Sequence, residues 1–598
     1  MKKKKISKKQ GASENLRLMI ILIIVLAVCG GIVTRLFFIQ ILKGGFYAAL
    51  AQDQQQIFQD LIPQRGDIFM QDKFSAQEDS EMEAGTELSA DGRNNYITVA
   101  TSRVYQMLYF VPKEISDDKR EDVIKNISRI LEKPEDEIMA KAAVKDDPYE
   151  PVAHKISDDQ AAQIKNLNIK GVYLSPETWR FYPAGNLLSQ ALGFVGFSDG
   201  GPAGAYGVEG FYNKELEGKS GLLEAARDAV GRWIFSGDYN MEPAQNGESL
   251  ILTIDQNIQF MAEKELKSVI EKWQAESGTV IVMDPPTGKI LAMASMPDYD
   301  PNNYSQATSS SVYLNPAVQG VYEPGSVFKP ITMAAAINEG KITPDTTYTD
   351  TGILKIGGYT VENAAEKSYG VCTMTKVLEK SINTGAVFAQ RSIGPDVFTS
   401  YVEKFGFGKK TGVDLEGEVL GSINNLKKGS PEINFATISF GQGISVTPIE
   451  LVSALGALAN QGKLMKPYIV DRIISADGNE TTIQPVVREQ VVSPETANKV
   501  TSMLVSTVKN GYDKIKIKNY NIAGKTGTAQ IANSDARGYS EDFIHTFIGY
   551  APAFDPKFII LLKIDKPKGT RFASDSLAPP FSSLAQYILN YYEIPPEE

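Results

Sequence analysis

The stretch YEPGSVFKPITMAAAINEG, residues 322–340, decides how the centre of this chain folds. Pro324 and Gly325 signal a turn directly before Ser326, and an apolar helical pattern follows and ends at Gly340. Ser326 is therefore predicted at the junction between a turn and a helix, near the positive end of the helix. Lys329 follows one helical turn later, so its side chain can lie on the same face as the serine hydroxyl.

This pairing supplies a base for nucleophilic catalysis. A lysine held beside a hydroxyl and away from water has its charged form disfavoured, so it can accept the serine proton. The chain has only two histidines, His154 and His545, which makes a Ser-His-Asp triad or a histidine-ligated metal site a poor fit. The plain alternative is that Ser326 only caps a helix and Lys329 lies on the surface.

Two further short motifs accompany the S-x-x-K of residues 326–329: the S-x-N of residues 381–383 and the K-T-G-T of residues 525–528. The small residues around Lys525 allow a backbone to approach closely along a strand. Each motif alone is weak, because residues 116–119, 422–424 and 410–412 also match one of them. Context separates them: Ser116 stands in a charged run that cannot desolvate a lysine, and Lys410 lies in a glycine-rich turn where an ordinary loop is the better reading.

Composition bounds the class of protein. The chain has 598 residues, 42% of them apolar and 22% charged, which indicates a folded protein with several cores. Two cysteines exclude a disulfide-stapled or zinc-ribbon architecture. A net charge of −11 argues against nucleic acid as a partner.

The N-terminus is predicted to anchor the chain in a membrane. Residues 18–34 carry no charge, and a helix over 18–39 would be about 33 Å long, enough to cross a bilayer. Seven basic residues against one acidic residue in 1–17 place the N-terminus in the cytoplasm and everything after about residue 40 outside. A cleaved signal peptide, or a lipoprotein-like cleavage before Cys29, is the alternative, but the apolar run continues past Cys29.

Hydrophobic patterns predict an α/β (α+β) fold for the outer part. Residues 279–283 and 289–294 form one predicted hairpin, and residues 545–550 and 558–564 another. Mostly helical patterns lie between them, and a final helix is predicted over 581–592, which together suggest an antiparallel sheet flanked by helices. Pro63 to Asp67 read as a turn into a strand. The acidic segment 71–95 reads as a solvated loop, and the glycine cluster at 193–210 as a loop.

At this point the chain resembles a known family. The ordered set YEPGSVFKP, KSINTG and AGKTGTAQ is similar to the penicillin-binding proteins and serine β-lactamases. MDPPTGKILAMASMPDYDPNNY and SFGQGISVTPIEL resemble the transpeptidase domain of class B penicillin-binding proteins, and RGDIF, YPAGN and YGVEGFYNKELEGKSG resemble the pedestal of that class. The expected organisation is a cytoplasmic tail at 1–17, a transmembrane anchor at 18–39, an elongated pedestal at 40–250 and a transpeptidase domain at 251–598.

The resemblance implies a mechanism as well as a fold. Ser326 would attack the D-Ala-D-Ala carbonyl of a peptidoglycan stem peptide, with Lys329 as general base and release of the terminal D-Ala. An amine from a neighbouring stem would resolve the acyl-enzyme. Backbone N–H groups of Ser326 and Thr528 would form the oxyanion hole. The implied catalytic residues are Ser326, Lys329, Ser381, Asn383 and Lys525, and the implied substrate-binding residues are Thr526, Gly527 and Thr528.

The resemblance also implies partners. We expect the stem peptides, β-lactam antibiotics, the membrane, a glycan polymerase of the shape, elongation, division and sporulation type and other division proteins, with no metal, cofactor or nucleic acid. The motifs look more like the septal or sporulation group than the elongation group. A β-lactam-hydrolysing or β-lactam-sensing relative and a non-catalytic division scaffold remain alternatives. The chain departs from the family after RGDIF, where Met70-Gln71-Asp72-Lys73 replaces the usual Asp-Arg-x-Gly turn. It shows no glycosyltransferase motif of the class A enzymes.

Overall fold

The computed structural model describes residues 56–71, 96–143, 148–198, 201–226, 240–512, 514–515, 517–533 and 538–597, with Met19, Leu22, 26–32, 35 and 36. The chain divides into two units, one made of residues 1–63 and 219–245 and the other of residues 64–218 and 246–598. In the first unit, three antiparallel strands pair in the order β1-β8-β9, with bounds Gln56–Leu61, Gly221–Ala226 and Asn240–Glu242.

The membrane anchor stays a prediction. None of the helices built from the described residues combines the length and the apolar character needed to cross a bilayer. The predicted span at 18–39 lies partly outside those residues, and so does nearly all of the acidic segment 71–95.

A seven-stranded sheet in the larger unit combines strands from residues 68–181 with strands from residues 249–255 and 470–482. Its order is β19-β18-β10-β2-β3-β4, with β5 paired to β3, and every pairing is antiparallel except that of β2 with β10. The strand predicted after the Pro63–Asp67 turn is confirmed as β2, and the boundary expected between residues 250 and 251 falls inside β10. The strands are β2 (Ile68–Gln71), β3 (Ile97–Phe110), β4 (Glu150–Ile156), β5 (Val172–Phe181), β10 (Ser249–Asp255), β18 (Val470–Ile474) and β19 (Glu480–Thr482).

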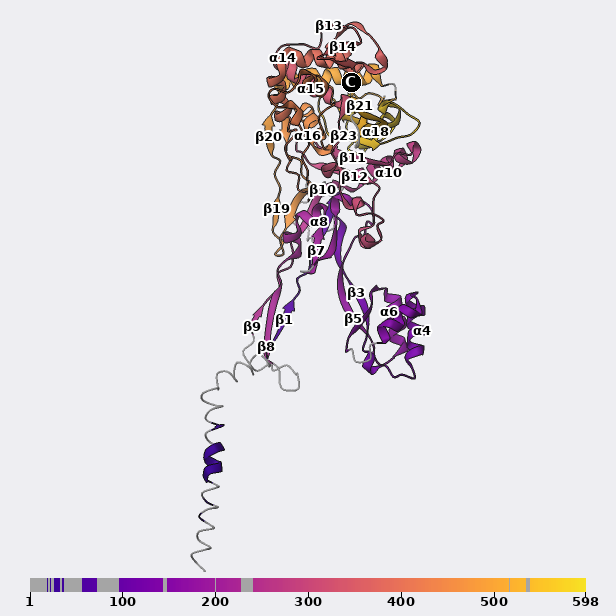
Figure 1. Cartoon of the computed structure of the whole chain (residues 1–598), viewed down its shortest axis with the longest axis vertical. Coiled ribbons are helices and arrows are strands. Elements are labelled where there is room, and N and C mark those ends of the chain that lie inside the picture. Colours follow the sequence, from indigo (N-terminus) through magenta and orange to yellow (C-terminus); the bar gives the residue numbers. More distant parts are fainter. Residues whose placement is uncertain are drawn as a thin grey trace, which may run out of the picture. The chain divides into compact units, whose positions relative to one another are not determined.

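Three helices pack on the long strands β3 and β5 (Figure 1). They are α4 (Arg120–Leu131), α5 (Glu135–Ala142) and α6 (Asp158–Leu167). Ile124 and Ile127 of α4 meet Leu108 and Phe110 of β3 in a separate small core. The start of α6 is fixed by a capping box between Ser157 and Gln160.

The glycine-rich segment 193–210 is not the loop that its composition predicts. It follows the short helix α7 (Ser189–Leu192) and folds into the hairpin β6 (Phe194–Ser198) and β7 (Gly201–Ala205), then the helices α8 (Gly207–Phe211) and α9 (Asn213–Glu217). The glycines serve close packing: Gly193 has a φ of +79°, and a Cβ there would lie 2.2 Å from the Tyr206 carbonyl oxygen. The prediction of a loop is therefore wrong, because glycine marks close backbone approach as well as freedom.

The second sheet confirms both predicted hairpins. Five antiparallel strands follow the order β12-β11-β23-β22-β21. Side chains alternate between two cores: Val280 and Leu562 face α10 and α18, whereas Ile281 and Leu561 face the core that contains α12, α16 and α17. The mixed α/β prediction, an antiparallel sheet flanked by helices, is therefore confirmed (Figure 1). The strands are β11 (Ser277–Met283), β12 (Ile290–Met296), β21 (Ala523–Ala532), β22 (Tyr539–Ala551) and β23 (Phe558–Asp565).

The remaining elements complete the helical part. The helices are α10 (Gln256–Trp273), α11 (Pro316–Gln319), α12 (Lys329–Asn338), α13 (Met374–Glu379), α14 (Asn383–Lys404), α15 (Glu432–Ile438), α16 (Pro448–Ala459), α17 (Pro494–Gly511) and α18 (Ala573–Tyr591). Small ladders pair β13 (Thr347–Asp350) with β16 (Gly370–Thr373), β14 (Ile353–Ile356) with β15 (Tyr359–Glu362), and β17 (Lys463–Met465) with β20 (Val487–Gln490).

The last helix begins eight residues earlier than predicted. It runs from Ala573, although Pro579 and Pro580 lie inside it and prolines usually disrupt a helix interior. Tertiary contacts hold the added turns in place, since the Ala573 N–H donates to the Thr528 hydroxyl and Leu577 is fully buried. The helix is thus set by its packing on the sheet rather than by local propensity.

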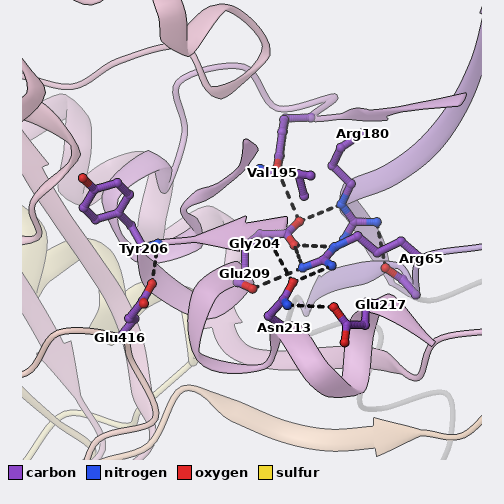
Figure 2. Close-up of polar contacts among 11 residues, drawn as sticks. Arg65, Arg180, Val195, Gly204, Tyr206, Glu209, Asn213, Glu217 and Glu416 are labelled. Atoms are coloured by element: carbon purple, nitrogen blue, oxygen red, sulfur yellow. Dashed lines mark hydrogen bonds and ion pairs between the residues drawn. The ribbon is translucent and has the colours of Figure 1, made fainter. Parts of the chain in front are cut away.

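A buried ionic cluster joins three segments of the larger unit (Figure 2). Glu209 of α8 is fully buried and accepts hydrogen bonds from Arg65 Nε and Nη2 (2.8 and 2.6 Å) and from Arg180 Nε (2.6 Å). Arg65 also donates to Asn213 Oδ1, and Arg180 to the Gly66 carbonyl oxygen. Burial alone would raise the pKa of Glu209, but the two guanidiniums hold it below its usual value. The charged form of Glu209 therefore ties β5 and the segment before β2 to α8.

We expect Glu209→Gln to lower the free energy of unfolding by about 3 kcal/mol or more, because it leaves two buried guanidiniums without their counter-charge. Urea unfolding of the purified protein measures this. Glu137→Gln is the matched control, since its partner Lys133 lies on the surface, and its effect should stay within about 0.5 kcal/mol. Equal, small effects of the two substitutions would contradict the prediction.

Candidate active site

Ser326 lies in a short 3-10 turn, Gly325–Phe328, that leads directly into α12, as the sequence predicts. The turn is held from behind: the Gly325 N–H donates to the Gly441 carbonyl oxygen (3.0 Å), and a Cβ on Gly441 would lie 2.1 Å from the Gly325 oxygen. Ser326 is half-buried, and its hydroxyl makes no hydrogen bond to any residue that the structure describes.

Lys329 is the first residue of α12 and is completely buried. Its Nζ lies 2.6 Å from the Ser381 carbonyl oxygen, 2.8 Å from Asn383 Oδ1 and 3.2 Å from Ser381 Oγ. Burial, and secondarily the nearby positive charge of Lys525, hold the pKa of Lys329 well below its usual value. The alternative of a surface lysine is therefore wrong.

The S-x-N motif lies between α13 and α14 and adopts an unusual backbone. Ser381 has a φ of +54°, in the left-handed region that costs a non-glycine residue about 1–2 kcal/mol. This conformation brings both its carbonyl and its hydroxyl to Lys329. Asn383 Nδ2 donates to the Glu362 carbonyl oxygen, which fixes the amide so that Oδ1 faces the lysine.

A second layer of side chains fixes the start of α14. Asn363 Oδ1 accepts from the Asn383 N–H (3.0 Å), and Asn363 Nδ2 donates to both carboxylate oxygens of Asp350. The Thr384 hydroxyl donates to Asp350 (2.6 Å). Burial raises the pKa of Asp350, but these hydrogen bonds outweigh it and lower the pKa overall. No sequence motif identifies Asn363 or Asp350, because both act only through the tertiary fold.

Lys525 reaches the same serine from β21. It is completely buried, and its Nζ donates to Ser381 Oγ (3.1 Å), the Thr526 carbonyl oxygen (3.1 Å) and Tyr512 Oη (3.3 Å). The structure therefore brings together the S-x-N and K-T-G motifs and the lysine of S-x-x-K, with Ser381 Oγ between two lysine amines. Sequence reasoning missed Tyr512, which belongs to no motif.

The remaining predicted residues lie along β21, the edge strand of the second sheet. A Cβ on Gly527 would lie 2.7 Å from the Pro324 carbonyl oxygen, so glycine is what permits β21 to approach the Ser326 turn. Thr526 and Thr528 are half-buried and alternate with the buried Lys525 and Gly527. The Thr526 hydroxyl contacts Tyr512 Oη (2.8 Å), and the Thr528 hydroxyl accepts from Ala573 N (3.1 Å).

The competing motif matches have ordinary surroundings. Ser116 is exposed. Thr411 is buried and bonded to Glu418, and Asn424 bonds locally to Ser422. None of them has a site residue as a hydrogen-bond partner among the described residues.

Known proteins resemble this chain in sequence and in fold. The family model "Penicillin binding protein transpeptidase domain" matches residues 278–586, and "Penicillin-binding Protein dimerisation domain" matches residues 92–252. The stage V sporulation protein D of Bacillus subtilis is 32% identical, covering 92% of this chain and 81% of its own length. The chain belongs to the class B penicillin-binding proteins. As a member of this class it is a peptidoglycan D,D-transpeptidase.

Two further relatives also match this penicillin-binding protein over most of its length. The peptidoglycan D,D-transpeptidase FtsI of Escherichia coli K12 is 30% identical, covering 83% of this chain and 82% of its own length. A crystal structure of penicillin-binding protein 3 from Mycobacterium tuberculosis, complexed with aztreonam, superposes with a TM-score of 0.66 at 25% identity. It covers 90% of this chain and 98% of the other.

One histidine of this penicillin-binding protein supports the K-T-G-T strand. His545 of β22 is fully buried opposite Thr528, with Nδ1 2.8 Å from Ser576 Oγ and Nε2 3.2 Å from the Arg571 carbonyl oxygen. A carbonyl only accepts, so Nε2 carries the proton and Nδ1 accepts from Ser576. Burial lowers the pKa of His545 to about 4. The neutral ring thus joins β22 to the start of α18.

This histidine predicts a loss of stability in mild acid. The unfolded chain binds a proton on His545 below pH of about 6.5 but the folded protein only near pH 4, so folding stability falls as pH drops through this window. The largest slope is about 1.4 kcal/mol per pH unit. Urea unfolding of the wild type and His545→Gln at several pH values from 7.5 to 4.5 should show their difference shrinking toward low pH. His154→Gln controls for the change of residue type, and a difference independent of pH would contradict this role.

Proposed function

We propose that this penicillin-binding protein cross-links peptidoglycan stem peptides through an acyl-enzyme on Ser326. The Ser326 oxygen attacks the D-Ala-D-Ala carbonyl, the peptide bond to the terminal D-Ala breaks, and an amine of a neighbouring stem then resolves the ester. The observation that carries the proposal is Lys329, a completely buried amine with a lowered pKa and no acidic partner among the described residues, one helical turn from Ser326.

Hydrogen-bond counting supports a neutral Lys329 as general base. The Ser381 carbonyl oxygen and Asn383 Oδ1 can only accept, and a neutral amine has two N–H groups to give them. Its lone pair then remains for a hydroxyl proton. The lowered pKa of Lys329 favours this neutral form, which is the form that a general base needs.

Ser381 and Lys525 complete the proton path. Lys525 gives one N–H to Ser381 Oγ and the other two to Thr526 O and Tyr512 Oη. Ser381 Oγ accepts from Lys525 and also lies within hydrogen-bond distance of Lys329 Nζ. The Ser326 proton passes to Lys329. Ser381 then gives its own proton to the departing D-Ala amine and takes up the one that Lys329 has received. Lys525 supplies positive charge to the same serine.

The edge strand β21 offers the binding surface. We assign the substrate carboxylate to the hydroxyls of Thr526 and Thr528, with Gly527 allowing the strand to pass close to the turn of Ser326. The N–H groups of Ser326 and Thr528 are assigned to the developing oxyanion, where one donor is typically worth about 10²–10³ in rate. β-Lactams would acylate Ser326 by the same route, which fits the capture of a relative with aztreonam.

We place the enzyme in septal or sporulation cell-wall synthesis, because relatives over most of the chain include a sporulation protein and FtsI. An elongation role is the alternative. The apolar segment 18–39, which carries no charge up to residue 34, would anchor it in the cytoplasmic membrane as a single-pass protein, with residues 1–17 inside and the pedestal (40–250) and transpeptidase (251–598) parts outside. In that position it would work beside a separate glycan polymerase and other division proteins.

Ser326→Ala tests the nucleophile. Intact-mass spectrometry of the wild-type protein with benzylpenicillin should show a long-lived covalent adduct, and the variant should show none, because it lacks the attacking oxygen. Ser116→Ala, which alters the exposed S-x-x-K, should label like the wild type. Rapid turnover without a lasting adduct would instead indicate a β-lactam hydrolase.

Lys329→Arg tests the base. Arginine stays protonated and cannot accept the Ser326 proton, so acylation by benzylpenicillin should fall by at least about 10³-fold. Lys376→Arg, at a partly exposed lysine of α13, should leave the rate unchanged. A Lys329→Arg protein that still acylates at the wild-type rate would remove Lys329 from the mechanism.

A further inference from the structure

Tyr512 contacts two of the proposed site residues although no motif includes it. It follows the last residue of α17, and its buried ring meets Phe547 edge-on, with centroids 5.8 Å apart. Its hydroxyl lies 3.3 Å from Lys525 Nζ, 3.1 Å from the Thr526 backbone nitrogen and 2.8 Å from Thr526 Oγ1. One hydroxyl thus bonds the lysine and both the backbone and the side chain of the threonine that follows it.

The direction of each hydrogen bond follows from what each partner can do. The Thr526 N–H can only donate, and the Lys525 ammonium can only donate, so both use the lone pairs of the Tyr512 oxygen. The proton of Tyr512 must then go to Thr526 Oγ1. Because Thr526 Oγ1 accepts this proton, its own hydroxyl proton is left to point elsewhere.

Thr528 is arranged in the same way. Its Oγ1 accepts from the Ala573 N–H at the start of α18, which likewise leaves the Thr528 proton available. Both threonines belong to the half-buried face of an edge strand. Two hydroxyls that each accept from the protein and donate outward form a pair of donors suited to an anion such as a carboxylate.

We propose that Tyr512 is a positioning residue for substrate recognition: by donating to Thr526 Oγ1 while accepting from Lys525, it turns the Thr526 hydroxyl into a donor for the substrate carboxylate. The inference rests on the proposed acyl-enzyme function and adds a determinant of affinity for ligands that carry a carboxylate. Tyr512 itself touches no reacting atom. Its removal should weaken ligand binding before acylation and leave the acylation step nearly unchanged.

Tyr512→Phe is the test, because it keeps the ring against Phe547 and removes only the hydroxyl. Acylation of the full-length protein is followed with benzylpenicillin and with its methyl ester, in which the carboxylate is neutral. For benzylpenicillin we expect the second-order rate constant of acylation to fall about tenfold, which is what one hydrogen bond to a charged group is worth. This loss should come from a larger dissociation constant of the complex that precedes acylation. For the ester the change should stay below about twofold.

Controls separate this role from a structural one. Tyr520→Phe removes another tyrosine hydroxyl near β21, one whose sole partner among the described residues is the Ile594 carbonyl oxygen, and should leave both rates unchanged. Thr526→Val should likewise slow acylation by benzylpenicillin more than acylation by the methyl ester. Adding Tyr512→Phe to Thr526→Val should slow acylation by benzylpenicillin little further.

The outcomes are distinct. Equal losses for the acid and the ester, or no loss in Tyr512→Phe, would overturn the role of Tyr512 while leaving the acyl-enzyme intact. A wild-type protein that benzylpenicillin does not acylate would overturn the proposed function, and the inference with it.

Discussion

Two lysine amines, completely buried, share the hydroxyl of one serine at the centre of this enzyme. Lys329 and Lys525 both reach Ser381 Oγ, and neither forms an ion pair with any described residue. Two adjacent ammonium ions without a counter-charge would repel each other and lose their hydration. Burial and this repulsion lower the pKa of Lys329, and a neutral amine can still satisfy the two obligatory acceptors beside it. The chemistry of the site therefore follows from how the fold withholds water and carboxylates from these two side chains.

The surrounding structure serves to keep that hydroxyl in place. Ser381 holds a left-handed backbone that its neighbours must stabilise, and the pair of Asn363 and Asp350 does so by fixing the first turn of α14. On the opposite side, Gly527 allows the edge strand to approach the Ser326 turn. Strain of this kind persists only where the surrounding contacts over-determine the conformation.

Local sequence patterns predicted much of the fold and of the site, and tertiary contacts determined the remaining features. Both hairpins, the turn before Ser326 and the strand around Lys525 were predictable, because alternation and turn residues act over a few positions. The segment 193–210 was not, since its glycines permit close packing instead of a loop, and neither was the start of α18, which depends on Thr528 and His545. Tyr512, Asn363 and Asp350 acquire their roles only by meeting the motifs across the fold, and no spacing rule signals such residues. The motifs themselves are ambiguous, as residues 116–119 and 410–412 illustrate. Burial separates Lys329 and Lys525 from the exposed Lys119 and Lys410.

The same molecule treats buried cations in two opposite ways, and the contrast separates structural charge from reactive charge. Around Glu209, two guanidiniums converge on one carboxylate, whose pKa is lowered, so every group keeps its charge. Around Ser381, two amines converge on a hydroxyl and carbonyl oxygens, and the pKa of Lys329 is lowered. Arginine suits the first site because it stays charged, and lysine suits the second because it can lose a proton when desolvated. A carboxylate is present in the first cluster and absent among the described partners of the second. This difference separates the cations that hold the fold from the lysine for which we propose proton exchange with a substrate.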